Sequence, residues 1–244
     1  RGSNPTLRMV SLAPPKLPRV FAWISSEALK TPPMIAARFP DWPKDDPAAH
    51  RQLTEAEVEA YLDRILLEQD EGDLWVFGYG SLMWKPEMDF AEARPALLNG
   101  WHRRFCLWQW RWRGSRHNPG LMLALDRGGA CRGIAYRLAA PGVREKVQAV
   151  WKREMSGNGY RPRWVRLTTM QGPVRGIVFT ANTESERYAG RIDDETVADH
   201  LATACGEAGT GAEYLLETVL KCEELGIHDR FLWRLQELVA ERMV

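Results

Sequence analysis

The stretch WVFGYGSLMW, residues 75–84, places three very small side chains, Gly78, Gly80 and Ser81, between two tryptophans. Residues 75–77 are strong strand formers and make an apolar run without alternation, which predicts a buried strand. The two glycines remove side chains that would block access to the main-chain amides. The pattern therefore predicts a loop whose N–H groups can bind a carboxylate or an oxyanion, and an ordinary strand exit into a turn is the alternative.

This segment does not match either of two common phosphate-binding motifs. No GK[ST] sequence follows it, which excludes a Walker loop. Its glycines are spaced G-x-G without a third at the required position, and the pattern predicts no clear helix after them, so a dinucleotide fingerprint is also excluded.

Composition limits the class of protein. The formal net charge of the 244 residues is +1, which predicts no general attraction to nucleic acid or to anionic membranes. No apolar run reaches the roughly 18 residues of a membrane helix, and no signal-peptide pattern is visible, so we expect a soluble, cytoplasmic protein. The four cysteines are far apart and form no C-x-x-C pair, which favours a reducing compartment over a disulfide framework or a metal site: Cys106, Cys131, Cys205 and Cys222.

The start of the chain differs in composition from the rest. Residues 1–50 hold nine of the fifteen prolines and show no sustained periodicity, which predicts an arm rather than a domain. Residues 51–73 are interpreted as a leading helix and linker. Thr54 followed by Glu57 matches a capping box, and apolar residues at helical spacing predict a helix over about 55–69.

Residues 74–244 form the third predicted unit. Short apolar runs broken by glycine indicate the strands of a largely antiparallel sheet or small barrel, one intervening segment has helical periodicity, and the chain becomes helical after Asp193. The fold class is therefore α+β, without an internal repeat. The predicted strands lie within residues 75–77, 97–108, 120–138 and 164–180, and the intervening helix is predicted at residues 142–155.

Residues 101–117, WHRRFCLWQWRWRGSRH, interleave tryptophans with arginines. Stacking and phosphate contacts make a nucleic-acid-binding module one interpretation. The alternation is typical of strands, however, and arginines beside tryptophans commonly stack on the rings within one protein.

A single carboxylate, Glu154, ends the predicted helix just before a Gly-Asn-Gly turn. The dipole at a helix C-terminus disfavours a negative charge, and the pKa of a carboxyl group there rises if the group is also buried. A solvated glutamate paired with Lys152 or Arg153 is the alternative interpretation.

Five short motifs occur in a fixed order along the chain: YGSL followed by Trp84, RRF at 103–105, G-x-A-Y-R-L at 133–138, R-E-x-x-x-x-G-Y at 153–160, and EYL at 213–215. Over about residues 74–240 the series resembles the ChaC family of γ-glutamylcyclotransferases, which cleave glutathione to 5-oxoproline and cysteinylglycine. One departure concerns substrate contacts near EYL, where similar proteins often carry an asparagine and this chain has Gly211.

The resemblance implies a small mixed barrel flanked by helices, with the YGSL loop and Glu154 on opposite walls of one cavity. In such a reaction the α-amine of the substrate attacks its own γ-carbonyl and closes a five-membered lactam. The enzyme must remove a proton from an ammonium, hold the substrate folded and stabilise an oxyanion, so no metal or other cofactor is expected. Glu154 is interpreted as general base and then general acid.

The glutamyl end of the substrate is expected to bind the main-chain amides of the loop, with Ser81 as a binding residue rather than a nucleophile. Tyr79 and Tyr214 are candidates for hydroxyl contacts, or alternatively core residues, and Arg104 is a candidate for a substrate carboxylate. Cyclisation of other γ-glutamyl amines or dipeptides is the alternative activity. No obligate protein partner is predicted. The expected substrate-binding residues are Gly78, Tyr79, Gly80, Ser81, Leu82, Met83, Arg104 and Tyr214.

Overall fold

The computed structural model describes residues 52–243. The predicted proline-rich arm, residues 1–50, lies outside the described residues, so its role stays a prediction. Five strands make up the central sheet: β1 (Leu74–Gly78), β2 (Glu92–Gln109), β3 (Gly120–Leu138), β4 (Tyr160–Thr169) and β5 (Gly172–Ala181).

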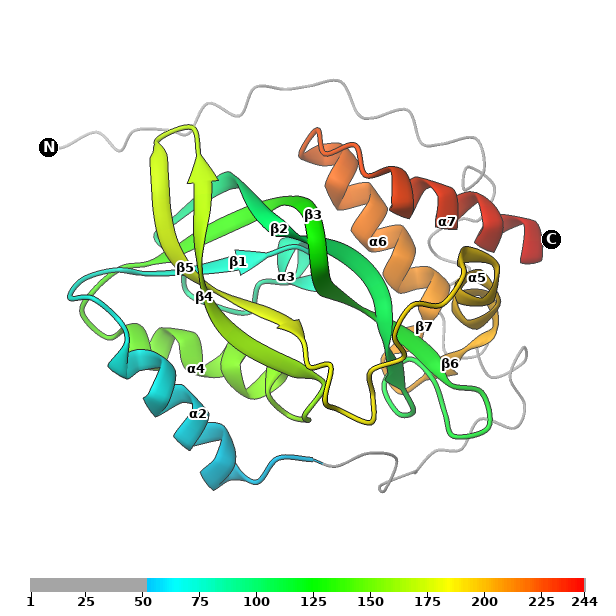
Figure 1. Ribbon diagram of the computed structural model, residues 1–244, viewed down its shortest axis with the longest axis horizontal. Coiled ribbons are helices and arrows are strands. Elements are labelled where there is room, and N and C mark those ends of the chain that lie inside the picture. Colours follow the sequence, from blue (N-terminus) through cyan, green and yellow to red (C-terminus); the bar gives the residue numbers. More distant parts are fainter. Residues whose placement is uncertain (1–51, 244) are drawn as a thin grey trace, which may run out of the picture.

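The five strands close into a barrel in the order β1, β3, β2, β4, β5 (Figure 1). Strand β1 pairs in parallel with β5, and every other neighbouring pair is antiparallel. Strands β2 and β4 pair over only two positions, Ala96 with Thr169 and Leu97 with Thr168, and the barrel depends on this short pairing to close. The α+β class and the largely antiparallel barrel are therefore confirmed.

Strand β1 is buried on both faces. Leu74 and Val76 belong to one hydrophobic core, whereas Trp75 and Phe77 belong to the other. Neighbouring side chains of a strand point to opposite faces, so a strand between two cores needs apolar residues at every position. This arrangement explains why apolar and polar residues do not alternate over residues 75–77.

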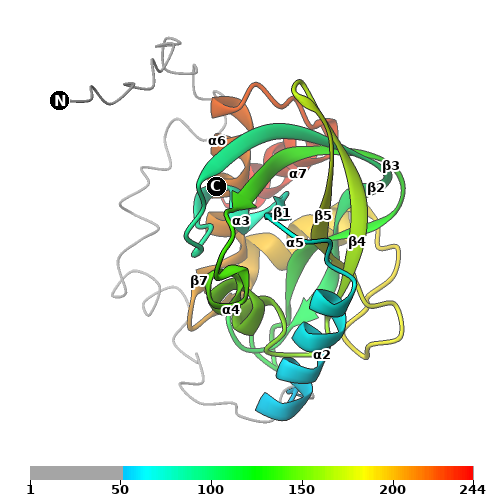
Figure 2. The same cartoon turned by 90° about the vertical axis from the view of Figure 1, so that its left-hand side faces the viewer.

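Helices cover the barrel in two groups (Figures 1 and 2). Helices α2 (Glu55–Leu67) and α4 (Val143–Glu154) pack on the core that contains Val76. The predicted capping box at Thr54 is present, since its hydroxyl accepts from the Glu57 N–H and the Glu57 carboxylate accepts from the Thr54 N–H. Helices α5 (Asp194–Thr203), α6 (Gly211–Glu224) and α7 (Arg230–Arg242) pack on the core that contains Phe77.

The glycine of the G-x-A-Y-R-L motif allows β1 and β3 to pack closely. A Cβ atom on Gly133 would lie 2.3 Å from the carbonyl oxygen of Gly78 and 2.8 Å from the ring of Phe77. Both distances are shorter than atomic contact allows, so the register of β1 on β3 requires a residue without a side chain here.

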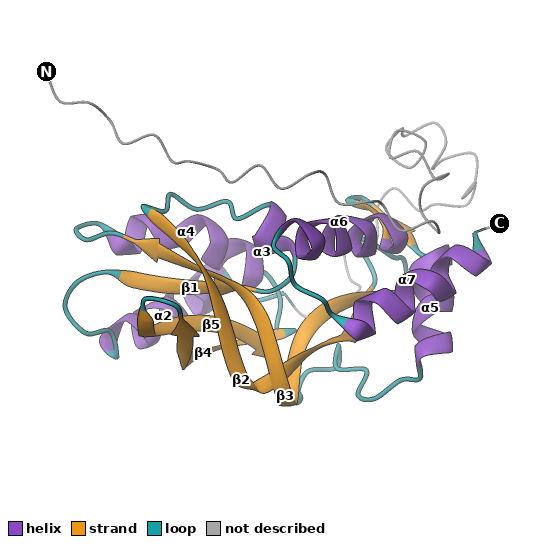
Figure 3. Ribbon diagram, turned by 90° about the horizontal axis from the view of Figure 1, so that it is seen from above, coloured by secondary structure: helices purple, strands orange, loops and turns teal. Residues whose placement is uncertain are grey.

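Three short elements were not predicted. A helix of four residues, α3 (Ser81–Trp84), begins directly after Gly80, so the expectation of no clear helix there was wrong. Strands β6 (Cys205–Gly206) and β7 (Gly209–Thr210) form a two-stranded sheet between α5 and α6. Elements of two to four residues are too short to carry a periodic pattern. Helix α3 matters most, because it lies between α4 and α6 (Figure 3).

Candidate active site

A narrow cavity lies where α3, α4 and α6 meet the barrel. Its open volume is about 10 Å³, which is roughly room for one water molecule. A ligand the size of an amino acid therefore requires side chains around the cavity to move. The lining residues are Tyr79, Gly80, Ser81, Leu82, Leu123, Glu154, Tyr160, Phe179 and Tyr214.

Glu154 is the last residue of α4 and supplies the only carboxylate among the described residues of this lining. Its side chain is 11% exposed, and Nε of Arg153 lies 3.3 Å from its Oε1. Burial raises the pKa of Glu154 above the usual range, while the positive charge of Arg153 opposes that rise. The carboxylate is thus both buried and paired, which combines the two interpretations that the sequence left open.

Arg153 connects Glu154 to the YGSL segment. Its Nη2 donates to Oγ of Ser81 at 2.6 Å, and its Nη1 donates to the carbonyl of Lys85 and to the carboxylate of Glu87, each at 2.9 Å. One guanidinium therefore fixes α3 against the end of α4. Sequence reasoning considered Arg153 only as an ion-pair partner of Glu154 and did not predict its contact with Ser81, although the R-E pair of the fourth motif was the available signal.

The tyrosines of the cavity use their hydroxyl groups differently. Tyr79 donates to the carbonyl of Phe179 at 2.7 Å, and Tyr160 donates to the carbonyl of Leu123 at 2.9 Å. Both hydroxyls are therefore engaged with the main chain, as expected of core residues. The hydroxyl of Tyr214, by contrast, accepts from a main-chain N–H, that of Ser81, at 3.3 Å, so its hydrogen can still be donated to a ligand.

The same three phenols remain neutral at physiological pH. Burial raises the pKa of Tyr79, Tyr160 and Tyr214, and the nearby charge of Glu154 raises each of them further. The cavity therefore contains neutral hydroxyls and one carboxylate. This combination can hold a proton on Glu154 without competition from a second acidic group.

Gly78 and Gly80 are each required to lack a side chain, for different reasons. A Cβ atom on Gly80 would lie 2.8 Å from the hydroxyl oxygen of Tyr214, so Gly80 leaves room for that hydroxyl beside the loop. On Gly78 it would lie 3.1 Å from both the Leu82 side chain and the Tyr136 ring, which is a packing constraint. Gly80 thus shapes the cavity, whereas Gly78 shapes the core.

The predicted site residues are only partly brought together. Glu154, Tyr79, Gly80, Ser81, Leu82 and Tyr214 all line the cavity. Gly78 ends β1 and Met83 is a buried core residue, and neither lines it. Arg104 lies elsewhere, with its Nη1 3.6 Å from Asp126 and its Nη2 donating to Nε2 of His102 at 3.1 Å.

Packing explains why this chain has Gly211 where similar proteins often carry an asparagine. A Cβ atom on Gly211 would lie 2.9 Å from the Cα and 3.0 Å from the carbonyl oxygen of Leu201. The first turn of α6 therefore rests directly on α5, and a larger residue would push the two helices apart. Because Tyr214 is in this same turn, the close packing also fixes the position of its hydroxyl.

The arginines of residues 101–117 are largely paired within the protein. Arg111 contacts Glu207 at 3.1 Å and lies 4.6 Å from the ring centre of Trp112, while Arg113 contacts Glu213 at 3.3 Å. These contacts match the alternative in which arginines stack and pair internally. They leave little free charge for phosphate groups in this part of the segment.

Two further properties concern residues 52–243 only. In this part of the chain, no group of three or more His, Cys, Asp or Glu side chains is arranged to hold a metal ion. Likewise, no helix formed by these residues has the length and apolar character needed to cross a membrane.

The chain is similar in sequence to two glutathione-specific enzymes. The chain is 41% identical over 161 residues to the glutathione-specific gamma-glutamylcyclotransferase of Escherichia coli K12, covering 66% of this chain and 70% of that protein. It is 32% identical over 152 residues to glutathione-specific gamma-glutamylcyclotransferase 1 of Mus musculus, covering 60% of this chain and 68% of the mouse protein.

The fold is also found in a solved structure. A crystal structure of the yeast gamma-glutamyl cyclotransferase specific to glutathione aligns with a TM-score of 0.64 at 20% identity, over 70% of this chain and 97% of the yeast protein. At this level of identity the likeness concerns the fold. The sequence model of the ChaC-like protein family matches residues 74–242, which is most of the described chain. The chain therefore belongs to the ChaC-like family.

Proposed function

We propose that this chain is a cytoplasmic, glutathione-specific γ-glutamylcyclotransferase that converts reduced glutathione to 5-oxoproline and cysteinylglycine. The observation that carries the proposal is the buried Glu154 beside the YGSL segment in one cavity. The names of the relatives from Escherichia coli and Mus musculus support the choice of glutathione.

In the first step Glu154 acts as general base. A carboxylate with a raised pKa accepts a proton from the α-ammonium group of the substrate more readily than an exposed one. The freed amine attacks the γ-carbonyl carbon, a C–N bond forms, and the carbonyl electrons move to the oxygen. Because the nucleophile belongs to the substrate, Ser81 has no covalent role.

The loop and Tyr214 stabilise the oxyanion in this proposal. The Ser81 N–H and the Tyr214 hydroxyl already face each other across 3.3 Å, so both are donors that a substrate oxygen can reach by replacing their mutual bond. Neutral phenols suit this role, since a phenolate would repel the developing charge.

In the last step the C–N bond to the cysteinyl residue breaks and Glu154 acts as general acid. The ring nitrogen keeps one hydrogen, whereas the leaving nitrogen, which had one as an amide, departs as an ammonium group with three. Glu154 carries protons between the two nitrogens. The positive charge of Arg153 favours the ionised form of the carboxylate, which is the form that acts as a base.

The test is direct. The purified full chain is incubated with reduced glutathione, with and without EDTA, and 5-oxoproline is measured by chromatography. We expect 5-oxoproline to form at the same rate in both arms. A protein that forms none, or that requires a divalent ion, contradicts the proposal.

The alternative activity is cyclisation of other γ-glutamyl amines or dipeptides, because Glu154 and the YGSL segment act only on the glutamyl half. The same assay with γ-glutamylalanine decides between the two. Comparable values of kcat/KM for both substrates favour the broader activity, and a strong preference for glutathione favours the narrower one.

A further inference from the structure

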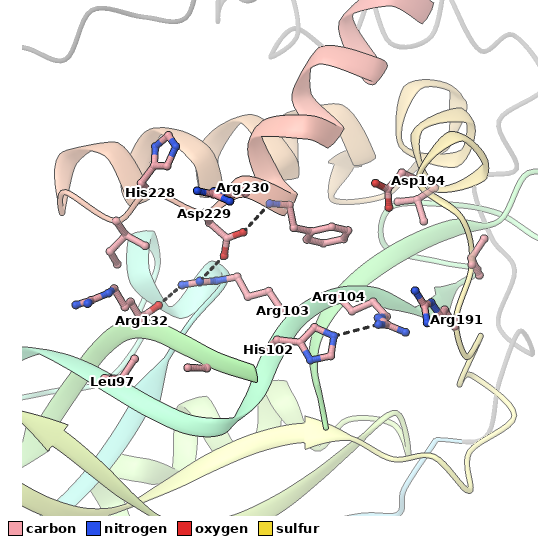
Figure 4. A pocket seen from close by; sticks show the side chains of 15 residues that line it. Leu97, His102, Arg103, Arg104, Arg132, Arg191, Asp194, His228, Asp229 and Arg230 are labelled. Atoms are coloured by element: carbon pink, nitrogen blue, oxygen red, sulfur yellow. Dashed lines mark hydrogen bonds and ion pairs between the residues drawn. The ribbon is translucent and has the colours of Figure 1, made fainter. Parts of the chain in front are cut away.

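A second and much larger cavity lies on another part of the barrel, between β2, β3 and the starts of α5 and α7 (Figure 4). We call it the arginine hollow. Its volume is about 600 Å³, which is within the usual range for small-molecule sites. It shares no lining residue with the Glu154 cavity. Five arginines line it: Arg103, Arg104, Arg132, Arg191 and Arg230.

Two of the five arginines are neutralised within the protein. Nη1 of Arg103 lies 2.8 Å from the carboxylate of Asp229, and Nη1 of Arg104 lies 3.6 Å from that of Asp126. Asp229 is fully engaged, since its other oxygen accepts from two main-chain N–H groups at the start of α7, those of Phe231 and Leu232. It therefore has little capacity to neutralise further arginines.

The other three arginines retain their charge. Arg132, Arg191 and Arg230 are exposed, and none of their guanidinium groups has an ion pair or hydrogen bond with another described residue. Among the described residues of the lining, Asp194 is the only remaining acidic one. Since the formal net charge of the whole chain is +1, this positive charge is a local feature.

The arginines come from separate parts of the chain. Arg132 is on β3, Arg191 precedes α5 and Arg230 begins α7, and all three border the same hollow (Figure 4). Between them the wall is apolar, formed by residues such as Val197, Ile227 and Phe231. The hollow thus combines free guanidinium groups with an apolar surface.

We propose that the arginine hollow binds a small phosphorylated molecule, such as a nucleotide or an inorganic polyphosphate. Guanidinium groups pair with phosphate through two parallel N–H···O bonds, and three unpaired arginines match a ligand with several negative charges. The volume suits a small molecule, and the apolar wall can hold an organic body attached to the phosphates. This site is separate from the proposed cyclotransferase function and needs no turnover to be detected.

The test measures binding to the full chain by isothermal titration calorimetry, without glutathione and with EDTA present. The probes are ATP, inorganic tripolyphosphate, uncharged adenosine and an RNA oligomer. The variants are Arg191→Ala and Arg230→Ala, with Arg166→Ala as the matched control, because Arg166 is an exposed arginine of β4 outside the hollow. Circular dichroism confirms that each variant is folded.

We expect ATP, tripolyphosphate or both to bind in a saturable way, with an affinity that falls as salt rises. Each hollow variant should weaken binding about tenfold, as loss of one charge-assisted phosphate contact does, and Arg166→Ala should not. The tighter of the two probes identifies the source of the phosphates, nucleotide or polyphosphate. The proposal is overturned if neither ATP nor tripolyphosphate binds in a saturable way at low salt, or if all three variants lose affinity equally. It is also overturned if adenosine binds as tightly as ATP, or if an RNA oligomer binds more tightly than both ATP and tripolyphosphate.

Discussion

The Glu154 cavity and the arginine hollow are formed by different residues of the same barrel and its helices, and they differ in volume, charge and lining. The first has an open volume of about 10 Å³ and is lined by one carboxylate and neutral phenols, whereas the second has about 600 Å³ and five arginines. Proton transfer benefits from a buried group whose pKa lies close to the working pH. Recognition of a charged ligand needs space and fixed charge instead, so the larger of these two cavities need not be the catalytic one.

Arg103 joins the two regions. Its side chain is 2% exposed; Nε donates to the carbonyl of Tyr79 at 2.6 Å, Nη1 pairs with Asp229, and Nη2 also contacts the carbonyl of Arg132. The same guanidinium thus donates to the YGSL segment and also belongs to a residue that lines the arginine hollow. Arg103 therefore supports both regions, whereas the lining residues of the Glu154 cavity act in one of them.

The largest effect is expected at Glu154. If the narrow cavity holds the chemistry, Glu154→Gln should lower the turnover of glutathione at least about 100-fold, because the amide cannot accept the proton. Ser81→Ala is the matched control and should cost less than about tenfold, since the Ser81 N–H and Arg153 remain. Steady-state kinetics of 5-oxoproline release measure both. Near-normal turnover of the glutamine variant, or a covalent glutamyl adduct on the wild-type protein by mass spectrometry, would reject the mechanism.

The next effect is on stability and concerns Arg103. Arg103→Met should lower the free energy of unfolding by about 3 kcal/mol or more, because it leaves Asp229 and the Tyr79 carbonyl without their buried partner. Arg132→Met is the control, since its guanidinium has no partner among the described residues, and it should change stability by less than about 0.5 kcal/mol. Urea unfolding followed by circular dichroism gives both values. Equal losses in the two variants would mean that Arg103 does not support both regions.

A smaller effect is expected in the pH dependence. The charge of Arg153 favours the ionised form of Glu154, so Arg153→Gln should raise the pKa of Glu154 further. A base must be ionised to act, and the acid limb of kcat/KM against pH should therefore move to higher pH. Lys152→Gln, one residue earlier and exposed, should leave the limb in place. A shift to lower pH, or none, contradicts the role assigned to Arg153.

The smallest effect is on the melting temperature of Glu154→Gln. The pKa of Glu154 is raised in the folded state. This residue therefore destabilises the fold increasingly as the pH rises from the pKa of Glu154 in the unfolded chain through its pKa in the folded protein. The uncharged glutamine should therefore melt slightly above the wild type at neutral pH, and the difference should vanish at acidic pH, below about 4. Thermal melts at several pH values measure it. A difference that grows toward acidic pH would mean that the carboxylate is stabilising, contrary to the direction of its pKa.

Local patterns in the sequence were sufficient for most of the secondary structure. The capping box at Thr54, the helical spacing that ends at Glu154 and the apolar run of β1 each depend on residues within a few positions of one another. The order of the five motifs likewise identified the family from the sequence, and it joined Glu154 and the YGSL segment in one predicted site. Their roles in catalysis stay predictions.

Tertiary structure alone decided which groups meet. Arg153 reaches Ser81 from 72 positions away, Tyr214 reaches the same loop from 133 positions away, and the arginine hollow takes side chains from four separate segments. The sequence also led to Arg104 as a substrate contact, and the register of β2 instead places it on the hollow. The periodicity of a segment reports only which of its own faces is buried. What that face touches depends on how the barrel closes, which is set by the parallel pairing of β1 with β5 about 100 residues later.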